Sequence, residues 1–267
     1  MIDNFSIIER DVLNFSDEGT FYMILILKRR KDTKGRMAEG VNEDNRLIKH
    51  FFVYDREYFN KKRQAIVNLC EQNDARAYIL PQRRSCRLVL WNLHDKISDT
   101  LKRGSMNTHF DHLIRSCVAG CHDVADKSHK RWVIDIDADE KDTLEVLKAL
   151  WRFSNPDSPT APVMFDMKPL AEYLASKIRR ALVLNYGNRA PDVQEFMPNT
   201  NAAYRDSDIC VLETPHGFHI VTPPFNREQK ALRKYLGGDF LKQDMIKPDA
   251  MALLYAPDSI AKSNPLD

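Results

Sequence analysis

The sequence lacks the features of membrane-spanning and secreted proteins. No apolar run approaches the ~20 residues that cross a bilayer, and the run through residues 22–27 is far shorter. The first residues, Met-Ile-Asp-Asn-Phe-Ser, show no basic start followed by an apolar segment, so no secretory signal is expected. Glycine is scarce, at 9 of 267 residues, which excludes a collagen. We therefore expect a cytoplasmic protein with no membrane partner.

Cysteine is also scarce, and its count of five is odd. An odd count without a signal favours reduced thiols in a cytosol-like compartment. Five cysteine and histidine residues lie close together in the sequence. They are potential zinc ligands, because thiolate and imidazole groups suit a tetrahedral ion. Their irregular order does not match the paired spacing of structural zinc sites, so a helix over 110–118 is the favoured interpretation. The less favoured zinc ligands would be His109, His112, Cys117, Cys121 and His122.

The charge is nearly balanced, with 40 Lys and Arg against 38 Asp and Glu, a net charge of +2. The halves differ, because residues 1–130 hold 23 basic and 18 acidic residues, a net +5, and the remainder is −3. A basic first half permits a polyanionic partner but does not require one. Hydrophobic residues at 43% and charged residues at 29% are typical of a globular chain.

Strand and helix patterns alternate along the chain. The aromatic and branched content that is typical of strands occurs at residues 20–27, 47–54, 76–80, 132–136, 209–213, 217–222 and 252–255. Helical periodicity runs over 55–73, 143–153, 168–184 and 226–235, and Ser85 is a candidate cap for a helix reaching about residue 101. The alternation favours a mixed α/β or α+β domain with helices packed on a sheet, and of these we predict the α+β class. A single compact domain over 1–267 is expected, with possible lobes over 1–105 and 131–256.

Two aspartates end the strand at 132–136, in the sequence Trp-Val-Ile-Asp-Ile-Asp. Side chains alternate faces along a strand, so Asp135 and Asp137 are expected on the same face. Two neighbouring carboxylates repel each other, and a divalent metal removes that cost. Hard oxygen ligands favour Mg²⁺ or Mn²⁺, commonly with phosphate oxygens completing the shell. We therefore predict Asp135 and Asp137 as metal ligands that activate phosphoryl or nucleotidyl transfer.

A second candidate site lies on the hairpin that turns at Thr-Pro-His-Gly. Gly217 opens the returning strand and His219 follows two residues later. A glycine permits a substrate to approach the backbone closely, and the imidazole can bind a phosphate. Downstream, Asp249 or, failing that, Asp244 is a candidate third acid near the last strand.

These three motifs, in this order, resemble those of the archaeo-eukaryotic primase superfamily, the primase-polymerases. The family's Asp-x-Asp is matched by Asp135 and Asp137, its small-x-His by Gly217 and His219, and its third acid by Asp249. The resemblance covers about residues 131–256. It implies a mostly antiparallel, RRM-like catalytic core, two metals held by the acids and a histidine on the nucleotide phosphates. An N-terminal α/β lobe would precede this core. The expected nucleotide-binding residues are Gly217, His219 and Lys247.

The first half offers a candidate nucleic-acid surface. Arginine forks suit phosphates, and an aromatic ring can stack on a base. The residues with this pattern are Arg76, Tyr78, Arg83 and Arg84, and a second basic run occupies 28–31.

The sequence therefore predicts a nucleotidyltransferase that uses Mg²⁺ or Mn²⁺ and acts on nucleic acid and nucleoside triphosphates. Its catalytic residues would be Asp135, Asp137, His219 and Asp249. Two alternatives stay open: a non-catalytic, phage-type accessory protein that binds nucleic acid, and a metal-dependent phosphohydrolase with Asp135 as nucleophile. Metal dependence of nucleotide incorporation would distinguish them.

Overall fold

The computed structural model describes residues 1–16, 18–29, 32, 46–104, 110–121, 130–137, 172, 175, 209–224, 245–247 and 250–261. The helices predicted over 143–153 and 226–235 lie outside these residues, as does most of the helix predicted over 168–184. Asp244 and Asp249 are outside as well, so the choice of third acid stays a prediction.

The larger sheet combines strands from both ends of the chain. Its order is β1 (Ile2–Asp3), β10 (Ala252–Ala256), β4 (Arg76–Ile79), β2 (Thr20–Lys28) and β3 (Arg46–Val53), and β5 (Arg84–Ser85) pairs with β2. The strands predicted over 20–27 and 47–54 are confirmed as β2 and β3, which pair antiparallel with Tyr22 opposite Val53. Because β10 pairs with both β1 and β4, the last strand of the chain completes a sheet built mainly from the first eighty residues.

The smaller sheet carries the predicted site strands. Its order is β7 (Cys210–Thr214), β8 (Gly217–Thr222), β6 (Trp132–Asp137) and β9 (Ile246–Lys247). The predicted hairpin of β7 and β8 is confirmed, with Thr214 opposite Gly217. Every strand pair within the described residues is antiparallel. The predicted α+β class with antiparallel sheets is therefore confirmed.

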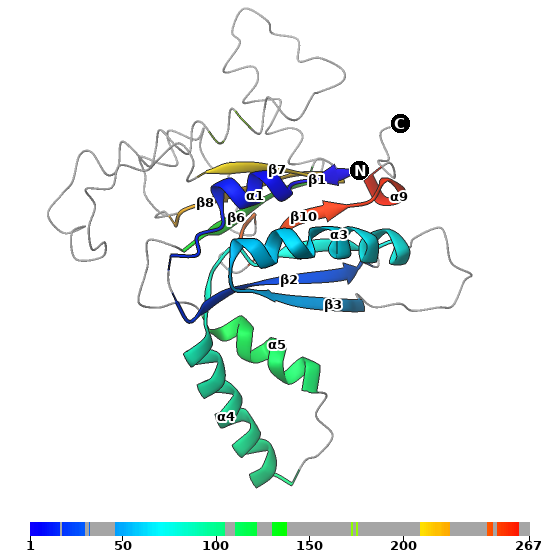
Figure 1. Ribbon diagram of the computed structural model, residues 1–267. Coiled ribbons are helices and arrows are strands. Elements are labelled where there is room, and N and C mark those ends of the chain that lie inside the picture. The colour runs from blue at the N-terminus through cyan, green and yellow to red at the C-terminus, as the bar shows by residue number, and fades with distance from the viewer. Residues whose placement is uncertain are drawn as a thin grey trace, which may run out of the picture.

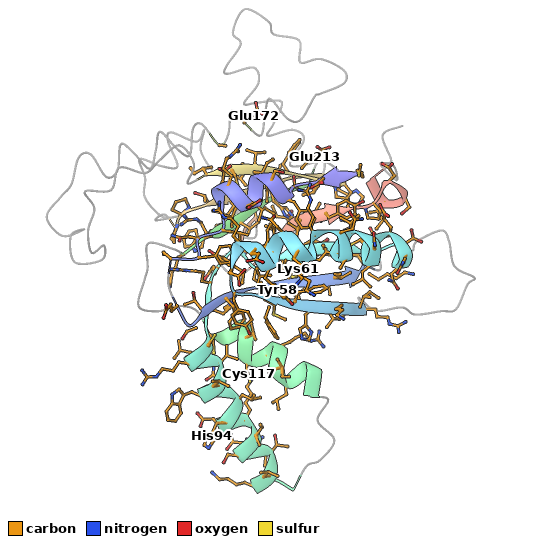
Figure 2. The ribbon with its side chains drawn as sticks, in the orientation of Figure 1. Tyr58, Lys61, His94, Cys117, Glu172 and Glu213 are labelled. Carbon is orange, nitrogen blue, oxygen red and sulfur yellow. The ribbon has the colours of Figure 1, made fainter. Side chains whose placement is uncertain are left out.

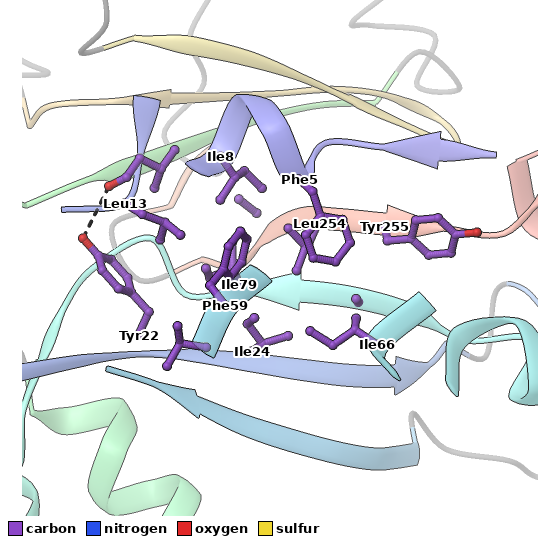
Figure 3. Packing of buried hydrophobic residues seen from close by; sticks show 14 of the residues in the cluster. Phe5, Ile8, Leu13, Tyr22, Ile24, Phe59, Ile66, Ile79, Leu254 and Tyr255 are labelled. Carbon is purple, nitrogen blue, oxygen red and sulfur yellow. Dashed lines mark hydrogen bonds between the residues drawn. The ribbon is translucent and has the colours of Figure 1, made fainter. Parts of the chain in front are cut away.

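Both sheets and two helices share one hydrophobic core. α1 (Phe5–Asp11) and α3 (Arg56–Asn73) contribute Phe5, Ile8 and Phe59, all at most 1% exposed (Figure 3). The larger sheet adds Ile24 and Ile79 among others, and the smaller sheet adds side chains of β6, β7 and β8 to the same cluster. This common core fixes one sheet against the other. The members from the smaller sheet are Val133, Cys210, Leu212 and Val221.

A pair of helices, α4 (Cys86–Lys102) and α5 (Phe110–Gly120), projects from the body beside β2 and β3 (Figure 1). Lys96 Nζ donates to Ser116 Oγ at 2.6 Å and joins the two helices. Figure 2 shows His94 on α4 and Cys117 on α5. The predicted cap is confirmed, because Ser85 Oγ accepts from Leu88 N. Large apolar side chains are exposed along α4, namely Leu88, Leu90, Trp91, Ile97 and Leu101.

The remaining short helix is α9 (Asp258–Ala261), which follows β10. None of the helices in the described ranges combines the length and the apolar character needed to cross a bilayer. The sequence pattern did not predict β1, α1, β9 or α9, which are all seven residues or shorter.

Candidate functional site

The pairing of β6 with β8 places the two best motifs side by side. Asp135 lies opposite His219, and Asp137 lies opposite Gly217. Residues that pair directly across antiparallel strands share one face of the sheet. The Asp-x-Asp and Gly-x-His motifs therefore lie directly opposite each other on paired strands, although about eighty positions separate them along the chain. The side chain of Asp137 lies outside the described part, so its role as a metal ligand stays a prediction.

His219 is held from two sides. Its Nδ1 accepts a hydrogen bond of 3.0 Å from the backbone N–H of Leu253 on β10. Because a backbone amide can only donate, the proton of the neutral ring is on Nε2. Nε2 faces Asp135 Oδ1 at 3.2 Å. The larger sheet thus fixes both the orientation and the tautomer of a histidine on the smaller sheet.

Lys247 contacts the other oxygen of the same carboxylate. It lies on β9, opposite Val133 of β6, and its Nζ is 2.6 Å from Asp135 Oδ2. Burial alone would raise the pKa of Asp135, but the hydrogen bond from His219 and the ammonium of Lys247 outweigh it. They hold the pKa of Asp135 well below its usual range. The carboxylate is therefore ionised at neutral pH.

This cluster borders a cavity of about 230 Å³. Whole-ligand pockets commonly measure about 300–1,000 Å³, so this one is large enough for only a small ligand or a part of a larger one. Its walls come from both sheets and from the turn between β7 and β8. The described lining residues are Arg29, Arg76, Tyr78, Asp135, Thr214, His216, His219, Lys247, Ala250, Met251 and Leu253.

Positive charge exceeds negative charge on the described lining. Three side chains are cationic, Arg29, Arg76 and Lys247, against one carboxylate, Asp135. Arg29 lies over the Tyr78 ring, with its guanidinium carbon 5.6 Å from the ring centroid. Such a cavity favours an anionic ligand that has an oxygen-rich, phosphate-like end.

Arg76 is buried and already bonded. Its Nε donates to Asp32 at 2.8 Å, and its Nη2 is 3.4 Å from Nε2 of His216. Asp32 is almost fully buried, at 2% side-chain exposure, and neutralises part of the charge of Arg76. Arg76 and Tyr78, two of the candidate nucleic-acid contacts, line the same cavity as Asp135 and His219.

Arg83 and Arg84 do not lie on this cavity wall. The structure buries them, with 2% and 1% of their surfaces exposed. A nucleic acid needs accessible guanidinium groups, so their burial does not favour the predicted contact. Arg29 is a cavity residue from the basic run at 28–31 that the sequence indicated. His216 is a cavity residue that the sequence analysis did not select, because its pattern indicated a turn.

The candidate zinc ligands are only partly described. Cys117 and Cys121 are buried, and Cys121 Sγ accepts a hydrogen bond from Asn92. His109 and His122 lie outside the described residues, as does the side chain of His112. Within the ranges that the structure describes, no three His, Cys, Asp or Glu side chains gather closely enough to hold a metal ion. The zinc interpretation therefore stays untested.

Asp135 fits one ligand position for Mg²⁺ or Mn²⁺. Its carboxylate is ionised, borders the cavity and offers the hard oxygen atoms that these ions prefer. Lys247 contacts one of these oxygens, so its ammonium would repel a metal bound there unless the side chain moved away. Asp137 and Asp249 stay predicted ligands.

No protein-family model, curated protein or solved structure matches the chain.

Proposed function

We propose that this protein is a metal-dependent nucleotidyltransferase of the primase-polymerase type, acting on nucleic acid and nucleoside triphosphates. The observation that carries the proposal is the cross-strand pair of Asp135 and His219 at a cavity lined by three cations. A carboxylate for a metal, a histidine donor and surplus positive charge are the groups that phosphoryl and nucleotidyl transfer require.

Each cavity residue has a role in this proposal. Asp135, with Asp137 and Asp249, would hold Mg²⁺ or Mn²⁺, which supplies charge stabilisation at the reacting phosphate. His219 would share its Nε2–H between Asp135 Oδ1 and a phosphate oxygen, because Leu253 keeps the proton on that nitrogen. The ammonium group of Lys247, on β9, would neutralise part of the negative charge of the phosphates. Catalysis would then consist mostly of positioning and charge neutralisation.

The fold supports a finer proposal. We propose that residues 131–256 form an RRM-like catalytic core around the smaller sheet, and that residues 1–105 form an accessory α/β lobe. β10 crosses this division, because it belongs to the second range and pairs with strands of the first. The two lobes would therefore form one unit, with the cavity along their junction.

A second candidate is a non-catalytic protein that binds nucleotides or nucleic acid. The observation that favours it is the Lys247–Asp135 ion pair, since an ammonium already balances the carboxylate without a metal. In this interpretation the cavity would bind phosphate groups through Arg29, Arg76 and Lys247 and would perform no chemistry.

Nucleotide incorporation tests the proposal. The full chain is incubated with labelled ribo- or deoxynucleoside triphosphates, primed and unprimed templates, and Mg²⁺ or Mn²⁺. We expect incorporation that requires the metal and that Asp135→Asn reduces at least about a hundredfold, the scale of losing one preorganised electrostatic group. Asp95→Asn is the matched control, because Asp95 is an exposed carboxylate on α4.

The outcomes separate the three functions. Incorporation by the wild type and its loss in Asp135→Asn support the transferase. Binding of nucleic acid without incorporation under any of these conditions would contradict the transferase and favour the accessory protein. Release of phosphate without incorporation, lost in Asp135→Asn, would favour a phosphohydrolase.

A further inference from the structure

Both oxygens of Asp135 are occupied by protein donors. His219 Nε2 lies 3.2 Å from Oδ1, and Lys247 Nζ lies 2.6 Å from Oδ2. Each oxygen keeps a second lone pair, but a divalent ion bound at Oδ2 would lie within a few ångströms of the Lys247 ammonium and would be repelled by it. Whether a donor moves away therefore determines how metal and nucleotide binding influence each other.

Lys247 is the donor that is free to move. Its side chain is 48% exposed and ends in a flexible four-carbon stem. His219 is 11% exposed and is anchored from behind by the backbone N–H of Leu253. Turning the imidazole would break a buried hydrogen bond, whereas swinging the lysine exchanges one ion pair for hydration.

We infer that Lys247 occupies a metal-ligand position of Asp135 as long as neither metal nor nucleotide is bound, and that it transfers to the phosphates of the nucleotide when the two bind together. This inference rests on the proposed function and adds a binding order to it. Metal alone should bind weakly, because a divalent ion must displace a cation that then has no anionic partner in the cavity. A nucleotide supplies that partner.

The charges around the cavity support this coupling. Asp135 is the one carboxylate on the described lining, against Arg29 and Lys247, and Arg76 is paired with Asp32. A divalent ion added alone would increase an already positive potential, and like charges a few ångströms apart repel. Triphosphate oxygens reverse the sign of the cavity. Metal and nucleotide should therefore strengthen each other's binding by the same factor.

Direct Mn²⁺ binding tests the inference without any reaction. Free Mn²⁺ is counted by electron paramagnetic resonance in the presence of the full chain, with and without a non-hydrolysable deoxynucleoside triphosphate analogue. Protein-free titrations correct for the Mn²⁺ that the analogue itself binds. The variants are Lys247→Met, which keeps the length and removes the charge, and Lys102→Met as a control on α4 outside the cavity. Asp135→Asn reports whether Mn²⁺ binds at this carboxylate.

We expect Lys247→Met to bind Mn²⁺ alone about fivefold more tightly than the wild type, the change that breaking a partly exposed ion pair supports. The analogue should enhance Mn²⁺ binding strongly in the wild type and in Lys102→Met, and only weakly in Lys247→Met. Unchanged or weaker Mn²⁺ binding in Lys247→Met, with binding still lost in Asp135→Asn, would overturn the inference and leave the proposed function standing. Absence of Mn²⁺ binding in every protein, with or without the analogue, would overturn both.

Discussion

At the scale of single residues, the environment of Asp135 decides what the site can do. The carboxylate is 24% exposed, and a lysine and a histidine hold its two oxygens. Sequence alternation predicted that Asp135 would face the same side as Asp137. It did not predict Lys247 as a direct partner of Asp135, because β9 has two residues and too little pattern to assign a register.

The lowered pKa of Asp135 predicts a specific loss of stability in acid. A carboxylate with a depressed native pKa contributes stability above its unfolded pKa, near 4, and this contribution is lost as the pH falls. Urea unfolding between pH 5 and pH 3 should therefore show a steeper fall in the free energy of unfolding for the wild type than for Asp135→Asn. Asp95→Asn, which removes one exposed carboxylate on α4, separates this effect from the loss of any negative charge. Equal slopes for the wild type and Asp135→Asn would contradict the ion-pair geometry.

At the scale of elements, local chemistry predicted most of the larger helices and strands in the described part. The aromatic and branched residues of β2 and β3 predicted two strands, and periodic apolar residues predicted α3. Short elements such as β1 and α1 have too few residues for a period to show. They are stabilised by tertiary contacts, such as the burial of Phe5 and Ile8 in the common core.

The two helix caps should differ in strength. Asp55 Oδ1 accepts from Tyr58 N at 2.6 Å at the start of α3, whereas Ser85 Oγ accepts from Leu88 N at 3.4 Å at the start of α4. Asp55 also places a negative charge at the positive end of its helix. We expect Asp55→Ala to lower the free energy of unfolding by about 1 kcal/mol and Ser85→Ala by less.

Chemical denaturation of both variants measures this difference. Asp55→Asn is the matched control, because asparagine keeps a capping oxygen and should remain close to the wild type. A larger loss for Ser85→Ala than for Asp55→Ala would show that the geometry of these caps does not determine their strength.

At the scale of the whole molecule, the site exists because distant segments meet. The sequence identified Asp135, His219, Arg76 and Tyr78 as candidates, and the structure brings all four to one cavity. Their convergence depends on the pairing of β10 with β4 and on the packing of the two sheets, which no local pattern specifies. The burial of Arg83 and Arg84 also results from tertiary packing. It could not be predicted, because the sequence does not distinguish a buried arginine from an exposed one.

Asn4 joins the two sheets next to this site. It is 3% exposed, and its Nδ2 donates to the carbonyl oxygen of Glu213 on β7 at 2.9 Å and to that of Leu253 on β10 at 3.1 Å. Leu253 in turn donates its N–H to His219. A single side chain near the start of the chain thus connects the strand that orients the histidine with the sheet that carries it.

Removing this connection should affect both stability and the site. We expect Asn4→Ala to lower the free energy of unfolding by about 2 kcal/mol, because buried carbonyl groups lose their donor. Asn60→Ala is the control, since Asn60 makes an exposed hydrogen bond to Glu9 and its loss should cost well under 1 kcal/mol. The ¹⁵N shifts of the His219 imidazole supply the second measurement. In the wild type they should report a proton on Nε2, and in Asn4→Ala a mixture of tautomers, because the hydrogen bonds of Asn4 no longer fix Leu253 of β10 relative to β7. If Asn4→Ala matched Asn60→Ala in stability and left the His219 tautomer unchanged, the position of the histidine would not depend on the contact between the sheets.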